Sequence, residues 1–149
     1  MRKIAPAPEH EVKLSRPDGE IIVRLKSPPL GHQAMVGRYF TPPVFYANGD
    51  ATRPIEDKPA TAEYAMLMGF VLLADVLTGE DKPSTPRPAP NADRPAWDAY
   101  GRALRAEFEA AGFCDGDVGA LLRGYQAVLA GRGKDLGKPE APSPESAGG

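Results

Sequence analysis

The chain has few residues of the kinds that most often carry chemistry. Among 149 residues it has one cysteine, Cys114, and two histidines, His10 and His32. A single cysteine excludes an intramolecular disulfide and a zinc site built from several thiolates. The same count is typical of a protein from a reducing compartment. The sequence therefore predicts no disulfide framework and no thiolate metal centre.

The chain also lacks an excess of positive charge. Lys and Arg number 18 and Asp and Glu number 20, which gives a net charge of -2. A domain that binds nucleic acid usually carries a clear basic excess on one face. No basic run stands out in this chain. We therefore expect no nucleic-acid partner.

Long hydrophobic runs are missing as well. The longest apolar stretch runs from Tyr64 to Ala74 and ends at Asp75, whereas a membrane span needs about 20 apolar residues. Residues 1–8 lack the apolar core of a secretory signal. These features predict a soluble, cytoplasmic protein that makes no contact with a membrane.

Proline (17) and glycine (16) are abundant, and they gather in particular segments. Residues 80–94 contain Pro83, Pro86, Pro88 and Pro90 without a large apolar residue, which is typical of a stiff, extended linker. Residues 132–149 are rich in Gly, Pro, Ser and Glu, which predicts a disordered tail. The predicted divisions are a flexible arm at 1–10, a β-hairpin plus an apolar helix at 11–79, a Pro-rich linker at 80–94, an αα-hairpin at 95–131 and a disordered tail at 132–149.

Residues 11–26 have the pattern of a β-hairpin. Apolar residues alternate with polar ones on both sides of Pro17-Asp18-Gly19. Proline pre-sets a turn, Asp18 can bond its own backbone, and Gly19 tolerates a positive φ. Because a lone hairpin is marginally stable in water, this one must pack against another element or a partner.

The next segment gives weaker signals. Residues 30–39 predict a short helix with Met35, Tyr39 and Leu30 directed inward. Residues 40–59 contain several prolines and predict a loop. The turn pair Asn48-Gly49 leaves a second small hairpin, formed by 44–46 and 52–55, as an alternative.

A helix that is apolar on nearly every side is predicted from about 60 to 78. Asp57 or Thr61 can cap it, and Gly79 is a natural stop. One apolar stripe holds Met66, Phe70, Leu73 and Leu77, and a second holds Tyr64, Leu67 and Val71. Such a helix must be covered on more than one side. We therefore assign the partner-binding face to Tyr64, Leu67, Met68 and Val71, and the alternative is that both stripes are core.

Two amphipathic helices with a short connection follow, which predicts an αα-hairpin. Asp93 can cap the first helix, and Asp115 or Asp117 can cap the second. The expected inner face of the first is Trp97, Tyr100, Leu104, Phe108 and Ala111, and that of the second is Val118, Leu121, Leu122, Tyr125, Val128 and Leu129. The predicted fold class is mainly α with a small N-terminal β-hairpin (α+β).

No pattern of catalytic or metal-binding residues stands out. Glu9-His10-Glu11 lacks the three or four converging ligands of a metal site, and His32 has no recognisable partner that would make it a general base. Cys114 precedes a helix but lacks a visible base. Asp115-Gly116-Asp117 begins like a calcium loop, yet Gln126 stands where the bidentate Glu is needed. We predict no catalytic, cofactor-binding or metal site; a small enzyme using Cys114 or His32 is an alternative.

The order of elements resembles that of the tail assembly chaperones of long-tailed bacteriophages. The resemblance covers residues 11–131: a short β-hairpin, a Pro-bounded connection and small amphipathic helices, followed by a Gly/Pro/Lys-rich end. It implies a non-catalytic protein that coats the apolar tape-measure protein and helps tail-tube subunits to polymerise around it. It also implies a longer form made by ribosomal frameshifting, for which Gly133-Lys134 and Gly137-Lys138 are dipeptides that slippery codons could encode.

A structural virion component, such as a connector or tail-completion protein, is a second hypothesis. In that case the Pro-rich segments would order against neighbouring copies in a homo-oligomer. The assembly hypothesis requires a groove for apolar protein segments between the helix at 60–78 and the αα-hairpin. The two hypotheses differ in the partner that they require, a client protein or further copies of this chain.

Overall fold

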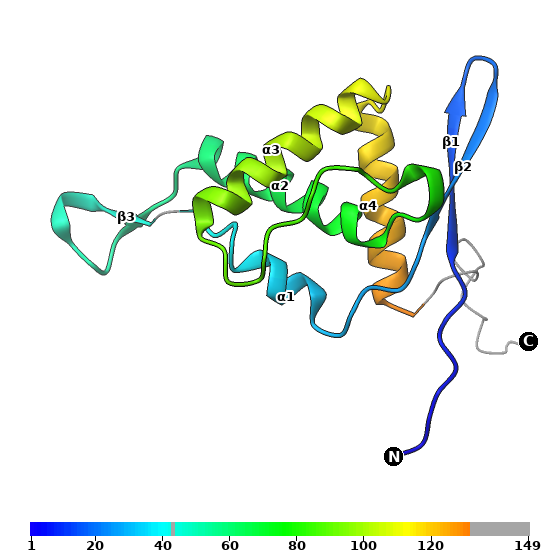
Figure 1. Ribbon diagram of the computed structural model, residues 1–149. Coiled ribbons are helices and arrows are strands. Elements are labelled where there is room, and N and C mark those ends of the chain that lie inside the picture. Colours follow the sequence, from blue (N-terminus) through cyan, green and yellow to red (C-terminus); the bar gives the residue numbers. More distant parts are fainter. Residues whose placement is uncertain (43, 132–149) are drawn as a thin grey trace, which may run out of the picture.

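A computed structural model of the chain describes residues 1–42 and 44–131, and the predicted tail with its two Gly-Lys dipeptides lies outside them (Figure 1). The predicted class, helices preceded by a small β-hairpin, is confirmed. The elements in chain order are β1 His10–Arg16, β2 Gly19–Leu25, α1 His32–Gly37, β3 Phe45–Tyr46, η1 Ala47–Gly49, β4 Pro54–Ile55, α2 Lys58–Val76, η2 Gly79–Asp81, α3 Arg94–Ala110 and α4 Asp115–Leu129.

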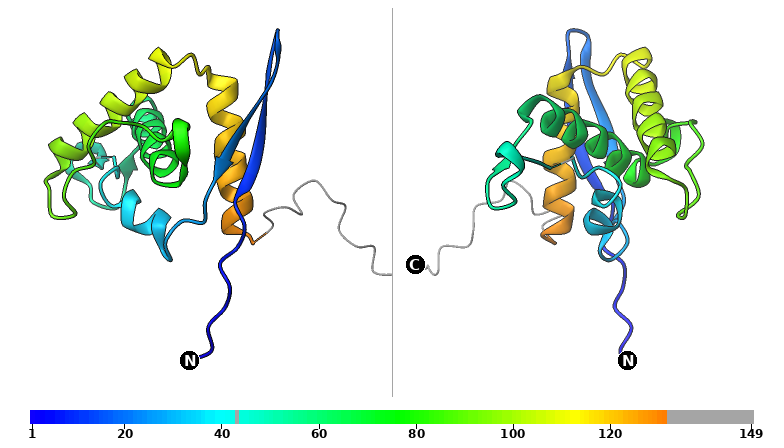
Figure 2. Two further views of the ribbon diagram at one scale, coloured as in Figure 1. Left: turned by 45° about the vertical axis from the view of Figure 1, so that its right-hand side comes forward. Right: turned by 90° about the vertical axis from the view of Figure 1, so that its left-hand side faces the viewer.

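Strands β1 and β2 form the expected antiparallel hairpin, in which Val12 pairs with Val23 and Leu14 with Ile21. Gly19 follows the turn with φ 137°, a conformation that L side chains rarely adopt. The apolar face of the hairpin lies against α4, and Figure 2 shows the two elements side by side. The hairpin is therefore stabilised by a helix from the far end of the chain, as a hairpin of this size requires.

Helix α2 is the centre of the core. The Asp57 carboxylate accepts a hydrogen bond from the Ala60 amide, so Asp57 is the N-cap and Pro59 lies in the first turn. By length and composition α2 could cross a membrane. Most of its second half is nevertheless buried between α1, α3 and α4, as expected of a core helix in a soluble protein. Lys26 donates its amide to the Val76 carbonyl (2.9 Å), which joins the end of α2 to the hairpin.

The Pro-rich segment 80–94 lies along α3 (Figure 1). The Glu107 carboxylate on α3 accepts hydrogen bonds from the amides and hydroxyls of Ser84 and Thr85, at 2.6–3.0 Å. Arg87 stacks over the Trp97 ring, with the guanidinium carbon 4.8 Å from the ring centroid. Proline stiffens this segment, and side-chain contacts fix its path. The elements before and after it share one apolar core.

The prediction for residues 30–39 was correct about a helix and wrong about its inner face. Helix α1 spans only His32–Gly37, and Leu30 is fully exposed before it begins. Met35 is 45% exposed, whereas Val36 and Phe40 are buried. Tyr39 stacks on Trp97 with ring centroids 4.2 Å apart, as an inward residue should. Such a short helix has no stripe of its own that decides which side faces the core.

The two C-terminal helices form as predicted, and three details differ. Ala111 is exposed because α3 ends at Ala110, and Leu129 is 40% exposed at the end of α4. The N-cap of α4 is Cys114, and Asp117 accepts a hydrogen bond from the Cys114 amide (2.9 Å). In residues 40–59 the alternative prediction, a small hairpin around Asn48-Gly49, is the one that forms, since β3 and β4 pair around η1.

Candidate functional site

The most elaborate polar arrangement in the described residues is a buried network of hydrogen bonds centred on His32. Its Nδ1 lies 2.7 Å from the Tyr125 hydroxyl, and its Nε2 lies 2.8 Å from Oδ2 of Asp75. Asp75 also accepts two hydrogen bonds from Arg87, at 2.9 and 3.2 Å. This network thus links α1, α2, α4 and the Pro-rich segment.

The groups that can only accept hydrogen bonds determine where the protons of this network lie. Burial acts to raise the pKa of Asp75, but hydrogen bonds from His32 and Arg87 outweigh it and hold that pKa below its usual value. The ionised Asp75 can only accept, so we assign the His32 proton to Nε2. Nδ1 then accepts from the Tyr125 hydroxyl, whose pKa is raised to about 12 by burial and by the nearby Asp75 charge.

A hydroxyl, an imidazole and a carboxylate in a row are also the parts of a nucleophile activated by a base. His32 and Asp75 line an open pocket of about 550 Å³, together with Lys26, Lys82 and Arg87. Tyr125 is not part of its lining, and no Tyr125 surface is exposed. A buried hydroxyl with a raised pKa is a poor nucleophile. The arrangement instead satisfies polar groups that would otherwise be costly to bury.

Sequence reasoning missed this network because it found no partner for His32. One signal was present. Asp75 interrupts the apolar run of α2, and a carboxylate within a buried helix must be paired or hydrogen-bonded. Asp75 therefore requires a hydrogen-bond donor beside it, and only the fold shows that the donors are His32 and Arg87.

The predicted partner face on α2 does not form a free surface. Leu67 and Val71 have no exposed surface, and Tyr64 and Met68 are half-buried. Leu67 packs so closely on α3 that a Cβ added at Gly101 would lie 3.1 Å from the Cβ of Leu67. Met68 packs in the same way on Gly37 of α1. Both apolar stripes of α2 are therefore core, which was the alternative interpretation of the sequence.

Exposed apolar side chains gather instead around the β3–β4 hairpin. Figure 1 shows this segment projecting away from the helices, at the opposite side of the molecule from β1 and β2. The exposed fractions are 58% for Val44, 53% for Phe45, 46% for Tyr46 and 51% for Ile55. We call these four residues the apolar knob. An exposed apolar group on a protruding segment is typical of a contact with another protein.

The other candidate residues of the sequence, Cys114, Asp117 and His10, do not form a catalytic or metal site in the described residues. Cys114 is exposed at the start of α4. Asp117 is bound by two nitrogens of Arg16, at 2.7 and 2.8 Å, so it joins the hairpin to α4. His10 is buried at the start of β1, and its Nε2 has no hydrogen-bond partner. In the part of the chain that the structure describes, no three His, Cys, Asp or Glu residues converge as metal ligands would.

No protein-family model matches the sequence, and no curated protein and no solved structure is significantly similar to it.

Proposed function

We propose that the chain is a non-catalytic assembly factor that binds an apolar segment of a partner protein through the apolar knob. The observation that supports this is the exposure of Val44, Phe45, Tyr46 and Ile55 on one protruding hairpin. Strands of two residues each bury little surface of their own. Their side chains are thus available to a partner at no cost to the core.

The energetics favour a protein partner with an apolar surface. Covering apolar side chains yields about 25 cal/mol per Å² removed from water. Aromatic residues such as Phe45 and Tyr46 are among those enriched where proteins meet. The layout of the chain adds a more specific proposal, namely a phage tail assembly chaperone in the host cytoplasm whose clients are tape-measure and tail-tube proteins.

The test is an affinity capture of the intact chain from lysate of its own source, read by mass spectrometry. We would compare the wild-type chain with a Phe45→Ser/Tyr46→Ser double variant. The matched control is Leu129→Ser, which removes an apolar residue that is 40% exposed at the end of α4. We expect one stoichiometric partner that the double variant loses and the control keeps.

Other outcomes would discriminate between the hypotheses. A long apolar partner would support the chaperone, whereas capture of further copies alone, as rings in negative stain, would favour a structural virion component. A partner retained by the double variant would exclude the apolar knob as the binding surface. Recovery of a lone monomer would contradict both hypotheses.

A further inference from the structure

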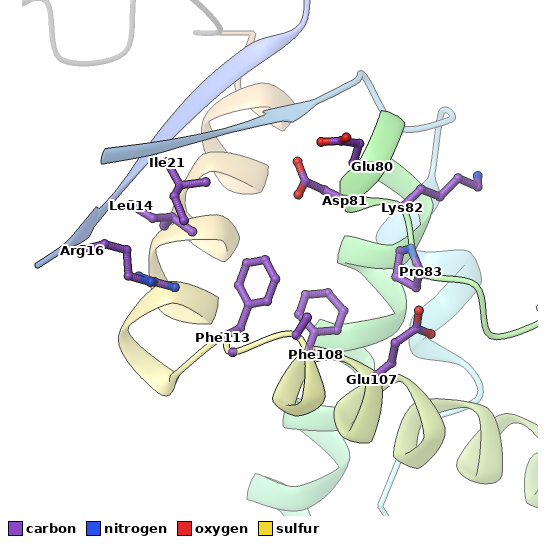
Figure 3. Close-up of a pocket in the computed structure, with 12 residues that line it drawn as sticks. Leu14, Arg16, Ile21, Glu80, Asp81, Lys82, Pro83, Glu107, Phe108 and Phe113 are labelled. Atoms are coloured by element: carbon purple, nitrogen blue, oxygen red, sulfur yellow. The ribbon is translucent and has the colours of Figure 1, made fainter. Parts of the chain in front are cut away.

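A second, separate surface lies on the other side of the molecule, between the β1–β2 hairpin, η2 and the turn from α3 to α4. It is a pocket of about 340 Å³ (Figure 3). Its apolar part is formed by Leu14 and Ile21 of the hairpin and by Phe108 and Phe113. Figure 3 shows Leu14 and Ile21 on one side of the pocket and Glu80 and Asp81 on another.

Ile21 is the residue whose exposure calls for an explanation. It shares the inner face of β2 with Val23 and Leu25, which have no exposed surface, yet Ile21 is 46% exposed. Its neighbour Ile22, on the outer face, is 47% exposed. An outer-face residue is expected to meet water in a two-stranded sheet. Ile21 instead faces the pocket, where no apolar side chain from the described residues covers it.

The rim of the pocket carries three carboxylates, Glu80, Asp81 and Glu107, and two cations, Lys82 and Arg16. Glu80 and Asp81 are adjacent in η2, and neither forms an ion pair with any residue in the described parts of the chain. Burial, and then the Glu80 charge, raise the pKa of Asp81. Lys82 forms no ion pair among the described residues, and Figure 3 shows its side chain directed away from Glu80 and Asp81. Arg16 already binds Asp117, and Glu107 already holds Ser84 and Thr85.

We propose that this pocket binds a large apolar side chain in an extended segment of a partner protein, with a Lys or Arg beside it that meets Glu80 and Asp81. The inference rests on the proposed function, because it describes the chemistry of the partner. A volume of about 340 Å³ is at the small end of the range for ligand pockets, which suits one side chain better than a cofactor. Rim charges of this kind determine which sequence binds more than how tightly it binds.

The test uses acetyl-Phe-Lys-amide as a probe, titrated into the full ¹⁵N-labelled chain and followed by amide chemical shifts. Such a small ligand should bind with a Kd on the order of 1 mM. We expect the amides of Ile21, Asp81 and Phe113 to shift together. Acetyl-Ala-Lys-amide should bind at least about fivefold more weakly, since it lacks the large apolar group. Acetyl-Phe-Glu-amide should bind about two- to fivefold more weakly, since its charge repels the rim.

Matched variants separate the pocket from the rest of the hairpin. Ile21→Ser should abolish the shifts, and Ile22→Ser, at a similarly exposed position on the opposite face, should leave them unchanged. Asp81→Asn should remove most of the preference for Phe-Lys over Phe-Glu. Both serine variants change exposed positions, and the dispersion of their amide spectra shows directly that they are folded.

Several results would overturn the inference. Absence of shifts at the pocket up to the highest soluble concentration would exclude the apolar anchor, and so would an equal loss of binding in Ile22→Ser. Equal binding of Phe-Lys and Phe-Glu would exclude the basic neighbour. The proposed function has a separate test: a partner captured through Phe45 and Tyr46 together with an empty pocket would refute this inference alone.

Discussion

Gly124 of α4 and Val12 of β1 approach so closely that a Cβ at position 124 would lie 2.6 Å from Cγ2 of Val12. It would also lie 3.1 Å from Cδ1 of Leu25. The contact occurs where the hairpin crosses the helix, between backbone segments far apart in the sequence. A residue without a side chain at this point allows the hairpin to lie flat on α4, which buries Val12, Leu14, Val23 and Leu25.

Replacement of Gly124 by Ala should therefore destabilise the protein, although Ala favours helices by about 1 kcal/mol. Overpacking of a core contact typically costs about 1–3 kcal/mol, so we expect a net loss in the free energy of unfolding. Urea unfolding followed by circular dichroism would measure it. Gly119→Ala on the same helix is the control and should stabilise, because its Cβ would meet nothing closer than the end of Arg123 at 3.5 Å. A gain in stability for Gly124→Ala would show that the hairpin can shift on the helix.

The Tyr125 hydroxyl should contribute to stability through His32. Tyr125→Phe keeps the ring and removes the donor, which leaves a buried imidazole nitrogen without a partner. An unsatisfied buried polar group costs about 1–3 kcal/mol, and that is the expected loss in the free energy of unfolding. The control Tyr46→Phe, at a residue that is 46% exposed, should stay within about 0.5 kcal/mol of the wild type. Equal values for the two variants would mean that water or another group replaces the hydroxyl.

Acid should weaken the contact between the Pro-rich segment and α3. Hydrogen bonds from the Ser84 amide and the Thr85 hydroxyl lower the pKa of Glu107 from 4.5 to about 2. A carboxylate with a lower pKa in the folded state than in the unfolded state adds stability above the unfolded value and loses it as the pH falls through the folded value. We expect about 1 kcal/mol of pH-dependent stability from Glu107 between about pH 5 and pH 2, since solvent screens this surface group.

Glu107→Gln should reduce that dependence when urea unfolding is repeated across the same pH range. Asp117, whose pKa is also lowered, mainly by its hydrogen bond to Arg16, contributes in the same direction and remains in the variant. Glu109→Gln, on an exposed position of the same helix, is the matched control and should leave the pH dependence unchanged. A Glu107→Gln variant with the wild-type slope would show that Ser84 and Thr85 do not hold the carboxylate in solution.

The burial of Leu67 predicts that Leu67→Asp unfolds the protein. The variant would place a carboxylate without a partner in a side-chain position that has no exposed surface, at a cost of several kcal/mol. That is a large part of the roughly 5–15 kcal/mol that stabilises a typical domain. Circular dichroism should show loss of the helical signal, whereas Phe45→Asp in the apolar knob should retain it. A helical Leu67→Asp variant would restore the face of α2 as a candidate contact surface.

The sequence alone predicted the elements that depend on near neighbours. Alternation around Pro17-Asp18-Gly19 predicted the β1–β2 hairpin, because pairing and turn are local. Asp57 and Asp93 marked the starts of α2 and α3, because a cap acts within one turn. The inner faces of α3 and α4 were largely correct for the same reason, since a stripe with helical spacing has one possible direction for burial.

Only the tertiary structure decided which surfaces remain free. The two stripes of α2 look alike in sequence, and each became core because α1, α3 and α4 cover them from separate directions. The partners of His32 come from residues 75 and 125, so no local spacing could relate them. Ile21 and Ile22 likewise have nearly equal exposure and different surroundings, because the strand turns one toward a pocket and the other toward water. Local patterns determine helices and strands, whereas burial is a property of elements that meet in space.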